Sequence, residues 1–514
     1  MTAPITRRRA LGGLGAAVLA GPSAAGAPAR SMRPPPRATR GARIASLDEI
    51  LDRAGVSGRV AVAAADPATG AILEARGEGE GLPPASVMKA LTAGYALDRL
   101  GPVHAFATRI HGTGPVEGGV LRGDLILAGG GDPTLDTPRL DALAAAVAGA
   151  GVRRIEGRLL TWDDALPAVR RIDPDQDAHL GYNAAVGGLN LNYNRVHFSW
   201  RREGDDYDLS FDARGGDLTP AWTGAEAVLA DRARPVYGYG SDGGRDRWTV
   251  ARRALGAEGA RWLPVRAPAA YAADILRVLA AGHGTALPAP SGRAEAPEGA
   301  ILAWDASSPL TEVIRGMLRY STNLTAEAIG LAASLRAGPI AAAPVPPAAD
   351  GRRVSPALAE SGARMAGWAE ERLGMGAPEL RIVDHSGLGD ESRVAAGAMA
   401  AGMARLCGPE GPAGGIGPLL RPFGMPNAAG EIDAGHPVKV AAKTGTLNFV
   451  SGLSGIATAP GGGRVAFAIF CADLERREAG LASGDEIPAG ARPWNARAKR
   501  LQRALIARWA AEYA

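Results

Sequence analysis

A serine and a lysine stand three residues apart in Ser86-Val87-Met88-Lys89, directly after Leu82-Pro83-Pro84-Ala85. Because proline is tolerated in the first turn of a helix, this segment predicts a helix that runs as far as Gly101-Pro102. Residues at i and i+3 share one helix face, so the Lys89 amine would lie close enough to take the Ser86 hydroxyl proton. The pair predicts a serine nucleophile with a lysine base, and N–H groups at the helix N-terminus would stabilise an oxyanion.

The composition adds weight to this short motif. The chain has 57 basic residues, of which only 4 are Lys. Where Arg serves almost everywhere, a retained Lys indicates a need that Arg cannot meet, and losing a proton is such a need. Considered alone, however, the motif is explained equally well by a surface lysine on an amphipathic helix.

A second motif is Lys443-Thr444-Gly445, which lies in a segment, Pro437 to Thr446, that alternates as a strand. Its chance expectation in this chain is roughly 0.02. Strand alternation places Thr444 and Thr446 on one side, where two hydroxyls suit a carboxylate, and Gly445 leaves space for the Ser86 helix or a ligand. A third element, Ser321-x-Asn323, lies between two predicted helices. On local grounds Asn323 could equally be a helix cap.

The order of the three elements, S-x-x-K, S-x-N and K-T-G, is the signature of β-lactamases and penicillin-binding proteins. About 235 residues separate Ser86 from Ser321, which indicates a domain-sized insertion. From about Leu47 onward the chain resembles the serine D-Ala-D-Ala carboxypeptidase/endopeptidase family, the class C low-molecular-weight penicillin-binding proteins. Two further segments, residues 129–135 and Asp384-x-Ser386-Gly387-Leu388, are family hallmarks that β-lactamases lack.

The chain departs from the family pattern in one loop. His385 stands where the family usually has Gly, and Gly389-Asp390-Glu391 precedes Ser392-Arg393 where the family usually runs straight from Leu to Ser-Arg. These differences leave the conformation of the loop open.

The resemblance implies a role for each motif residue. Ser86 would attack the carbonyl between two D-alanines, with Lys89 as base. The backbone N–H groups of Ser86 and Thr446 would hold the oxyanion. The remaining residues would relay a proton to the leaving amine (Ser321, Lys443), hold the substrate amide (Asn323) and bind the terminal carboxylate (Thr444, Thr446).

The resemblance also implies the partners. Peptidoglycan stem peptides would be the substrates, β-lactams would act as covalent inhibitors, and no metal or cofactor would be required. In the family an acidic residue of the inserted region can bind the amine of the diamino acid in the stem peptide. Asp177, ahead of Tyr182-x-Ala184, is the best match here, although it lacks the usual flanking Trp.

The pattern of elements predicts an α/β (α+β) fold. A β-lactamase/transpeptidase-like domain, with a central antiparallel sheet flanked by helices, is expected from residues 44–103 and 290–514. Residues 104–289 are expected to form a large, mainly β inserted accessory region of two small subdomains. Helices are predicted at Leu47 to Ala54 and Trp494 to Tyr513, and short strands at Arg59 to Ala64 and Arg381 to Asp384.

The N-terminus predicts export. Residues 1–29 have the pattern of a twin-arginine signal peptide, with Thr6-Arg7-Arg8-Arg9 before a short, mildly apolar run. A basic, Pro-rich linker of residues 30–43 follows. Beyond the signal we find no apolar run long enough to span a bilayer. The protein is therefore expected to be periplasmic or cell-wall associated, without a transmembrane segment after processing.

Charge and composition disfavour several function classes. The first 47 residues contain eight Arg and no acid, so residues 48–514 carry 49 basic and 53 acidic side chains, which does not predict nucleic-acid binding. The seven His lack metal-ligand spacing, which disfavours a zinc peptidase. Cys407 and Cys471 could pair, but two isolated Cys are more often buried and free.

Two alternatives to the peptidase remain open. A β-lactamase would use the same residues with fast deacylation, although the insertion argues against it. A catalytically silent peptidoglycan-binding protein could keep the fold, but the complete serine, lysine and asparagine set argues against lost activity.

Overall fold

The computed structural model describes residues 44–242, 245–340 and 354–514. The expected signal peptide and nearly all of the linker lie outside the described residues. The chain divides into two units, residues 1–44 and 45–514, and the fold described below is that of the second unit. Among the described residues, no helix is both long enough and apolar enough to cross a membrane.

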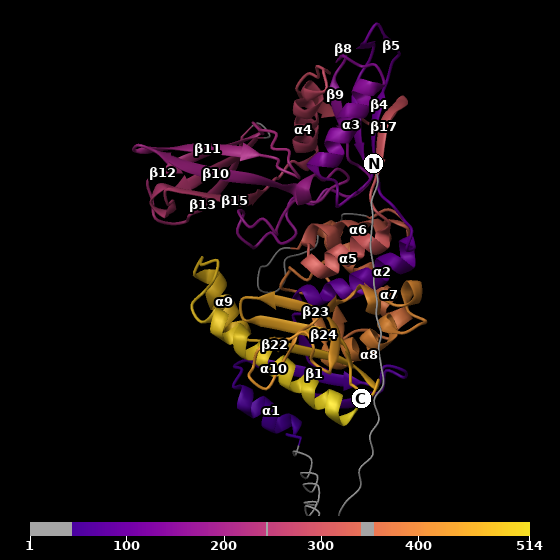
Figure 1. The fold of residues 1–514 in the computed structure, drawn as a ribbon, viewed down its shortest axis with the longest axis vertical. Coiled ribbons are helices and arrows are strands. Elements are labelled where there is room, and N and C mark those ends of the chain that lie inside the picture. Colours follow the sequence, from indigo (N-terminus) through magenta and orange to yellow (C-terminus); the bar gives the residue numbers. More distant parts are fainter. Residues whose placement is uncertain (1–43, 243–244, 341–353) are drawn as a thin grey trace, which may run out of the picture. The chain divides into compact units, whose positions relative to one another are not determined.

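A six-stranded antiparallel sheet, which includes β23, β24 and β1, lies among helices in the lower part of Figure 1. Its strands, in spatial order, are β2 (Ile72–Arg76), β1 (Arg59–Ala65), β25 (Arg464–Ala472), β24 (Val450–Thr458), β23 (Lys439–Leu447) and β20 (Arg421–Pro422). β24 and β25 are buried on both faces, as expected for central strands of a covered sheet. The expected mixed α/β fold with a central antiparallel sheet is confirmed.

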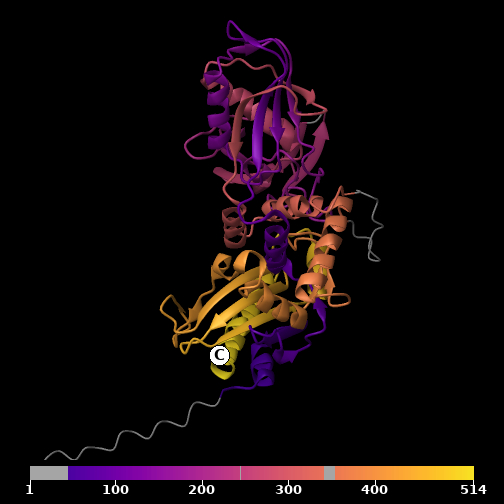
Figure 2. The same cartoon turned by 90° about the vertical axis from the view of Figure 1, so that its right-hand side faces the viewer.

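Helices cover both faces of this sheet (Figure 2). One face packs against a cluster built mainly from α2 (Met88–Leu100), α5 (Leu310–Tyr320), α6 (Asn323–Leu335), α7 (Pro356–Leu373) and α8 (Ala396–Cys407). The other face packs against α1 (Leu47–Ala54) and α10 (Ala491–Glu512). α1 begins at a capping box, in which Ser46 and Glu49 each bond the backbone N–H of the other, and it ends at left-handed Gly55. α9 (Leu474–Ala482) follows β25 directly.

A second sheet of five strands lies between α2 and α5 in the sequence. Its spatial order is β16 (Pro290–Arg293), β9 (Leu159–Trp162), β7 (Leu125–Gly129), β4 (Ala107–Gly112) and β17 (Ala300–Ala306). α3 (Thr137–Gly149) and α4 (Pro268–Gly282) contribute to the core beside it. Because β16 and β17 pair with β9 and β4, the boundary expected at residue 290 cuts through this sheet.

Several smaller sheets complete the unit. Two three-stranded sheets lie between β9 and α4 in the sequence; they are β11 (Asp206–Asp212), β10 (Arg195–Glu203), β15 (Glu258–Pro264) and β12 (Ala225–Ala230), β14 (Arg245–Ala251), β13 (Tyr237–Asp242). The short strands are β18 (Leu380–Arg381), β19 (Arg393–Ala395), β3 (Gly81–Leu82), β21 (Met425–Pro426), β22 (Ile432–Asp433), β5 (Val116–Glu117), β6 (Val120–Leu121) and β8 (Arg154–Ile155). Cys407 and Cys471 are both buried and free, the more common of the two states that the sequence left open.

Candidate active site

Ser86 lies in a 3-10 turn, Ala85–Val87, immediately before α2. The α-helix therefore starts later than the sequence predicts, because Ala85 has a φ of 47° and cannot continue a right-handed helix. β23 packs against this turn at Gly445. A Cβ on Gly445 would lie 2.6 Å from the Pro84 carbonyl oxygen and 2.9 Å from the Ser86 nitrogen. Glycine is thus required here for the close approach that the sequence analysis anticipated.

The Lys89 side chain is fully buried beneath the turn, and its Nζ has three polar neighbours. These are Ser86 Oγ at 2.9 Å, Asn323 Oδ1 at 2.7 Å and the Ser386 carbonyl oxygen at 2.8 Å. Two of the three can only accept a hydrogen bond, whereas the serine hydroxyl can also donate one. A neutral amine has two N–H donors and one lone pair, so it satisfies all three neighbours while accepting the Ser86 proton.

Burial also favours the neutral amine, since it lowers the pKa of Lys89, although the nearby carboxylates of Glu327 and Asp384 act in the opposite direction. Those two carboxyl groups are themselves fully buried. Burial, together with their mutual repulsion, raises the pKa of Glu327, and burial raises the pKa of Asp384. The lysine and both carboxyl groups are therefore all shifted toward their uncharged forms.

The loop from Asp384 to Gly389 holds the carbonyl that binds Lys89. Glu327 accepts hydrogen bonds from the backbone N–H groups of His385 (2.9 Å) and Ser386 (2.8 Å). Asp384 accepts from the N–H groups of Gly387 and Gly389. Gly387 has a φ of 71°, and a Cβ there would lie 1.9 Å from the Ala85 carbonyl oxygen. The loop thus rests directly on the Ser86 turn.

His385 fills the core beneath this loop. Its Nε2 lies 2.6 Å from Ser361 Oγ, and its ring stacks on Tyr95 with the ring centroids 6.3 Å apart. Burial lowers the pKa of His385 to about 3, so the imidazole is neutral at physiological pH. The unexpected His at this position is therefore a packed core residue with a defined hydrogen-bond partner.

Lys443, on β23, is 2% exposed and approaches Ser321. Its Nζ lies 3.0 Å from Ser321 Oγ and 2.8 Å from the Thr444 carbonyl oxygen. Burial is the main cause that lowers the pKa of Lys443, and the neighbouring basic groups of Lys89 and Arg421 act in the same direction. Ser321 itself is the left-handed residue that ends α5, with a φ of 59°. This turn directs the chain from α5 into α6, whose first residue is Asn323.

Asn323 connects Lys89 to the segment between β9 and β10. Its Oδ1 accepts from Lys89, and its Nδ2 donates to the Tyr182 carbonyl oxygen at 3.0 Å. These two contacts fix the orientation of the amide. An amide nitrogen carries two N–H groups, so one remains available for a substrate.

These groups surround a cleft of about 440 Å³. Ser86, Ser321, Asn323 and Thr446 line it, and Asp177 lies exposed at its wall. Lys89 and Lys443 are buried next to it, and Thr444 and Gly445 occupy the β23 positions between Lys443 and Thr446. The structure therefore brings the residues singled out in the sequence into one site.

The sequence analysis did not identify the groups that hold Lys89 from below. The role of Glu327 could have been predicted from the sequence, because it is the only charged residue in α6, a helix that is otherwise mostly Ala, Leu and Ile. A lone acid among apolar residues indicates a buried role. The contacts of the Ser386 and Tyr182 carbonyls could not have been predicted from residue types, since every residue supplies a backbone oxygen.

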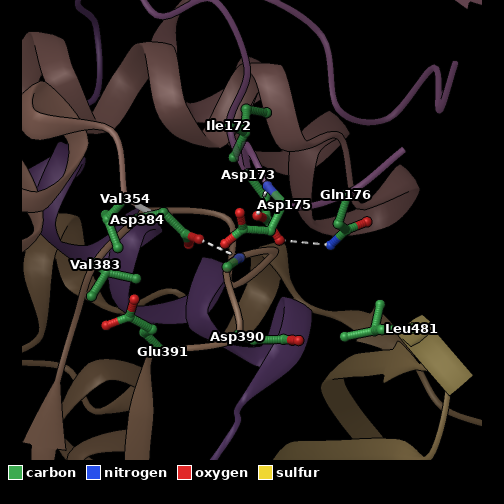
Figure 3. Close-up of a pocket in the computed structure, with 11 residues that line it drawn as sticks. Ile172, Asp173, Asp175, Gln176, Val354, Val383, Asp384, Asp390, Glu391 and Leu481 are labelled. Carbon is green, nitrogen blue, oxygen red and sulfur yellow. Dashed lines mark hydrogen bonds between the residues drawn. The ribbon is translucent and has the colours of Figure 1, made fainter. Parts of the chain in front are cut away.

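A small acidic pocket adjoins the cleft and shares Asp175 and Gln176 with it (Figure 3). Asp173 is 7% exposed there and accepts from the Asp175 N–H and from Gln176 Nε2. Burial, reinforced by the negative charge of Asp390, raises the pKa of Asp173 to about 6. Within the described ranges, no group of three or more His, Cys, Asp or Glu side chains is arranged to hold a metal ion.

Known proteins resemble this chain in sequence and in fold. The chain is 31% identical over 317 residues to the D-alanyl-D-alanine carboxypeptidase of Actinomadura sp. (strain R39), a match that covers 56% of this chain and 57% of that relative. The chain thus spans little more than half the length of that curated relative.

The fold is similar to that of penicillin-binding protein 4 from Haemophilus influenzae, with a TM-score of 0.68 and 20% identity over 89% of this chain and 99% of that one. The structure of the same protein complexed with a β-lactam gives a TM-score of 0.65 and 19% identity, with the same coverage. The model of the D-Ala-D-Ala carboxypeptidase 3 (S13) family matches residues 44–487. With a match over most of its length, the chain belongs to the D-Ala-D-Ala carboxypeptidase 3 (S13) family.

Proposed function

We propose that the protein is a serine-type D-alanyl-D-alanine carboxypeptidase/endopeptidase that acts on peptidoglycan stem peptides through an acyl-enzyme on Ser86. The observation that carries this proposal is the buried Lys89 amine, 2.9 Å from Ser86 Oγ and paired with two obligate acceptors. Family membership and the D-alanyl-D-alanine carboxypeptidase activity for which the Actinomadura relative is named support the same reaction.

In the acylation step, Ser86 Oγ bonds to the carbonyl carbon between two D-alanines while its proton passes to Lys89 Nζ. The N–H groups of Ser86 and Thr446 stabilise the oxyanion. Collapse of this intermediate breaks the C–N bond, and the leaving amine takes a proton relayed from Lys89 through Ser321, whose hydroxyl lies 3.0 Å from the Lys443 amine that steers it. Water then attacks the ester, which releases the acid and restores Ser86.

The remaining site residues are assigned to positioning and recognition. Asn323 orients Lys89 and uses its second Nδ2 proton for the substrate amide. Thr444 and Thr446 bind the terminal carboxylate. Asp177, exposed at the cleft wall, binds the amine of the diamino acid in the stem peptide. β-Lactams follow the same acylation route and form a stable ester on Ser86; the complex of the Haemophilus protein with a β-lactam supports binding of this class of ligand.

The test is covalent labelling with penicillin, followed by peptide mapping. We expect one slowly hydrolysed adduct, on Ser86, and no labelling of Ser86→Ala. Incubation with purified muropeptides should release D-alanine or cleave cross-links, as read by mass spectrometry. Turnover within seconds without an adduct would instead indicate a β-lactamase, and the absence of both adduct and cleavage would indicate a silent binding protein.

We further propose that residues 104–306 form an accessory region inserted in the catalytic domain, with its end moved to residue 306 because β16 and β17 pair with β9 and β4. We also propose that residues 1–29 direct export by the twin-arginine route to the periplasm or cell wall. Replacing Arg7, Arg8 and Arg9 by Lys should abolish export in a fractionation assay while the charge is kept. Undiminished export of this variant would argue for the general secretory route.

A further inference from the structure

Arg477 is a buried arginine on α9 that none of the motifs includes. It lines the active-site cleft, although it is only 5% exposed. Its Nε lies 2.9 and 3.0 Å from the two carboxylate oxygens of Asp390, and its Nη2 bonds the same carboxylate. Its Nη1 donates to the Asn448 carbonyl oxygen at 3.0 Å. One guanidinium therefore joins two segments of the chain, and its fork geometry makes both contacts at once.

The first of these segments is the loop that holds Lys89. Asp390 follows Gly389, whose N–H bonds Asp384, and it lies three residues after Gly387, which rests on the Ser86 turn. Figure 3 shows the Asp390 side chain extending toward Leu481 at the end of α9. Asp390 belongs to the three residues, Gly389 to Glu391, by which this chain departs from the family pattern.

The second segment is the turn that ends the K-T-G strand. Asn448 lies two residues after Thr446, between β23 and β24. The next residue, Phe449, is buried at a φ of 58°, a left-handed conformation that a bulky side chain adopts only when its surroundings impose it. Asn495 Nδ2 also donates to the Leu447 carbonyl oxygen at 3.2 Å, so the turn is fixed from two helices.

We propose that Arg477 and Asp390 are positioning residues for acylation, which brace the Thr446 end of β23 against the loop that binds Lys89. The brace fixes the distance between the Thr446 N–H on β23, which stabilises the oxyanion, and the Lys89 amine, which takes the Ser86 proton. This inference rests on the proposed function, because it concerns the geometry of that same reaction.

The attraction between the opposite charges of Arg477 and Asp390 does not by itself explain why the pair is buried here. A buried ion pair often adds little net stability compared with apolar residues of similar volume, because both charges lose their hydration. The extra bond from Nη1 to a backbone carbonyl is what gives this pair a geometric role. The variant Arg477→Lys keeps a cation beside Asp390, but an ammonium lacks the planar fork that bonds Asp390 and the Asn448 carbonyl at once. It therefore tests the two-sided contact apart from the effect of the charge pair.

The experiment measures acylation by benzylpenicillin, resolved into the dissociation constant of the first complex and the acylation rate constant. A displacement of about 1 Å at a catalytic donor can cost on the order of 10² in rate. For Arg477→Lys we therefore expect the acylation rate constant to fall by roughly tenfold or more, with the dissociation constant changed less than about twofold. The double variant Arg477→Met with Asp390→Leu, which leaves no unpaired buried charge, should show the same loss.

Arg508→Lys is the matched control. Arg508 also forms a forked pair with a carboxylate, Glu74, and donates from Nη1 to a backbone carbonyl, that of Ala45, but it joins β2 and the residue before the N-cap of α1 to α10, and it does not line the cleft. Its acylation rate constant should stay at the wild-type value. Wild-type rates in both Arg477 variants, or an equal loss in Arg508→Lys, would overturn the brace. Failure of the wild-type protein to acylate at all would count against the proposed function instead.

Discussion

Lys89 and Lys443 should differ in their tolerance of arginine. The neutral Lys89 amine donates to Asn323 Oδ1 and the Ser386 carbonyl and accepts the Ser86 proton. A guanidinium has five donors, no acceptor, and does not lose its proton in proteins. Lys89→Arg therefore removes the base, and acylation should fall by roughly 10²–10⁴, the usual contribution of a positioned general base.

Lys443 presents a different set of contacts. Its two neighbours, Ser321 Oγ and the Thr444 carbonyl oxygen, can both accept a hydrogen bond, so a guanidinium can replace the ammonium if the pocket accommodates it. The residue is 2% exposed, so the larger side chain strains the packing by about 1–3 kcal/mol. If about a third of that strain raises the activation barrier, the barrier increases by at most about 1 kcal/mol. The acylation rate constant should then fall by less than about tenfold.

The assay compares penicillin acylation rates of the two variants in folded protein of matched melting temperature. Lys439→Arg is the control, since Lys439 lies exposed on the same strand and bonds only the Ala434 carbonyl among the contacts described for it. Its rate should equal that of the wild type. Equal losses in Lys89→Arg and Lys443→Arg would refute the reasoning, because either Lys443 would also exchange protons or the site would reject guanidinium on shape alone.

Two further predictions concern stability. Gly387→Ala would place a Cβ 1.9 Å from the Ala85 carbonyl at a φ of 71°, so the free energy of unfolding should fall by at least about 2 kcal/mol. Gly367→Ala, inside α7 with no atom within 4 Å, should instead raise it by about 0.5–1 kcal/mol in the same denaturant titration, and a common sign would contradict the steric argument. The pKa of Asp173, about 6, lies above its unfolded value, so the folded state favours the neutral carboxyl group. The contribution of Asp173 to the free energy of unfolding is therefore present below pH 4 and is lost as pH rises to 6, by up to about 3 kcal/mol. Asp173→Asn should remove that part of the decline in unfolding free energy between pH 4 and 7, and an unchanged slope would show that Asp173 ionises normally.

The sequence predicted the fold well where the pattern is local. The amphipathic α1 and the strand β1 match their expected ranges closely. The strand expected from Arg381 to Asp384 is limited to Leu380–Arg381, because the Val383 N–H turns to Ser392 Oγ and Asp384 bonds its own loop. Such side-chain-to-backbone bonds compete with a strand and leave no periodic signal.

The candidate site was predictable to the extent that side chains define it. Ser86, Lys89 and Lys443 carried rare, ordered motifs. The support beneath them depends on backbone carbonyls and on Glu327, which reaches His385 58 residues away. No local pattern encodes a contact over that separation, and the same holds for the bond between Arg477 and Asp390. The later end that we propose for the inserted region has a related basis, since β17 is recognisable as part of that sheet only by its pairing with β4.

The register of β1 has a consequence for how the chain is made. Arg59 to Ala65 of β1 pair with Ala472 to Ala466 of β25, so β1 can form this pairing only after about 400 further residues have been synthesised. At 5–20 residues per second, a ribosome needs on the order of 20–80 s to synthesise that interval. During this time β1 can pair with β2, which follows it in the sequence, but its other edge, which pairs with β25 in the finished sheet, stays open although Ala61 to Ala65 are apolar and fully buried there. Nascent chains must therefore pass through a long-lived state with an open sheet edge, in which chaperone binding competes with aggregation.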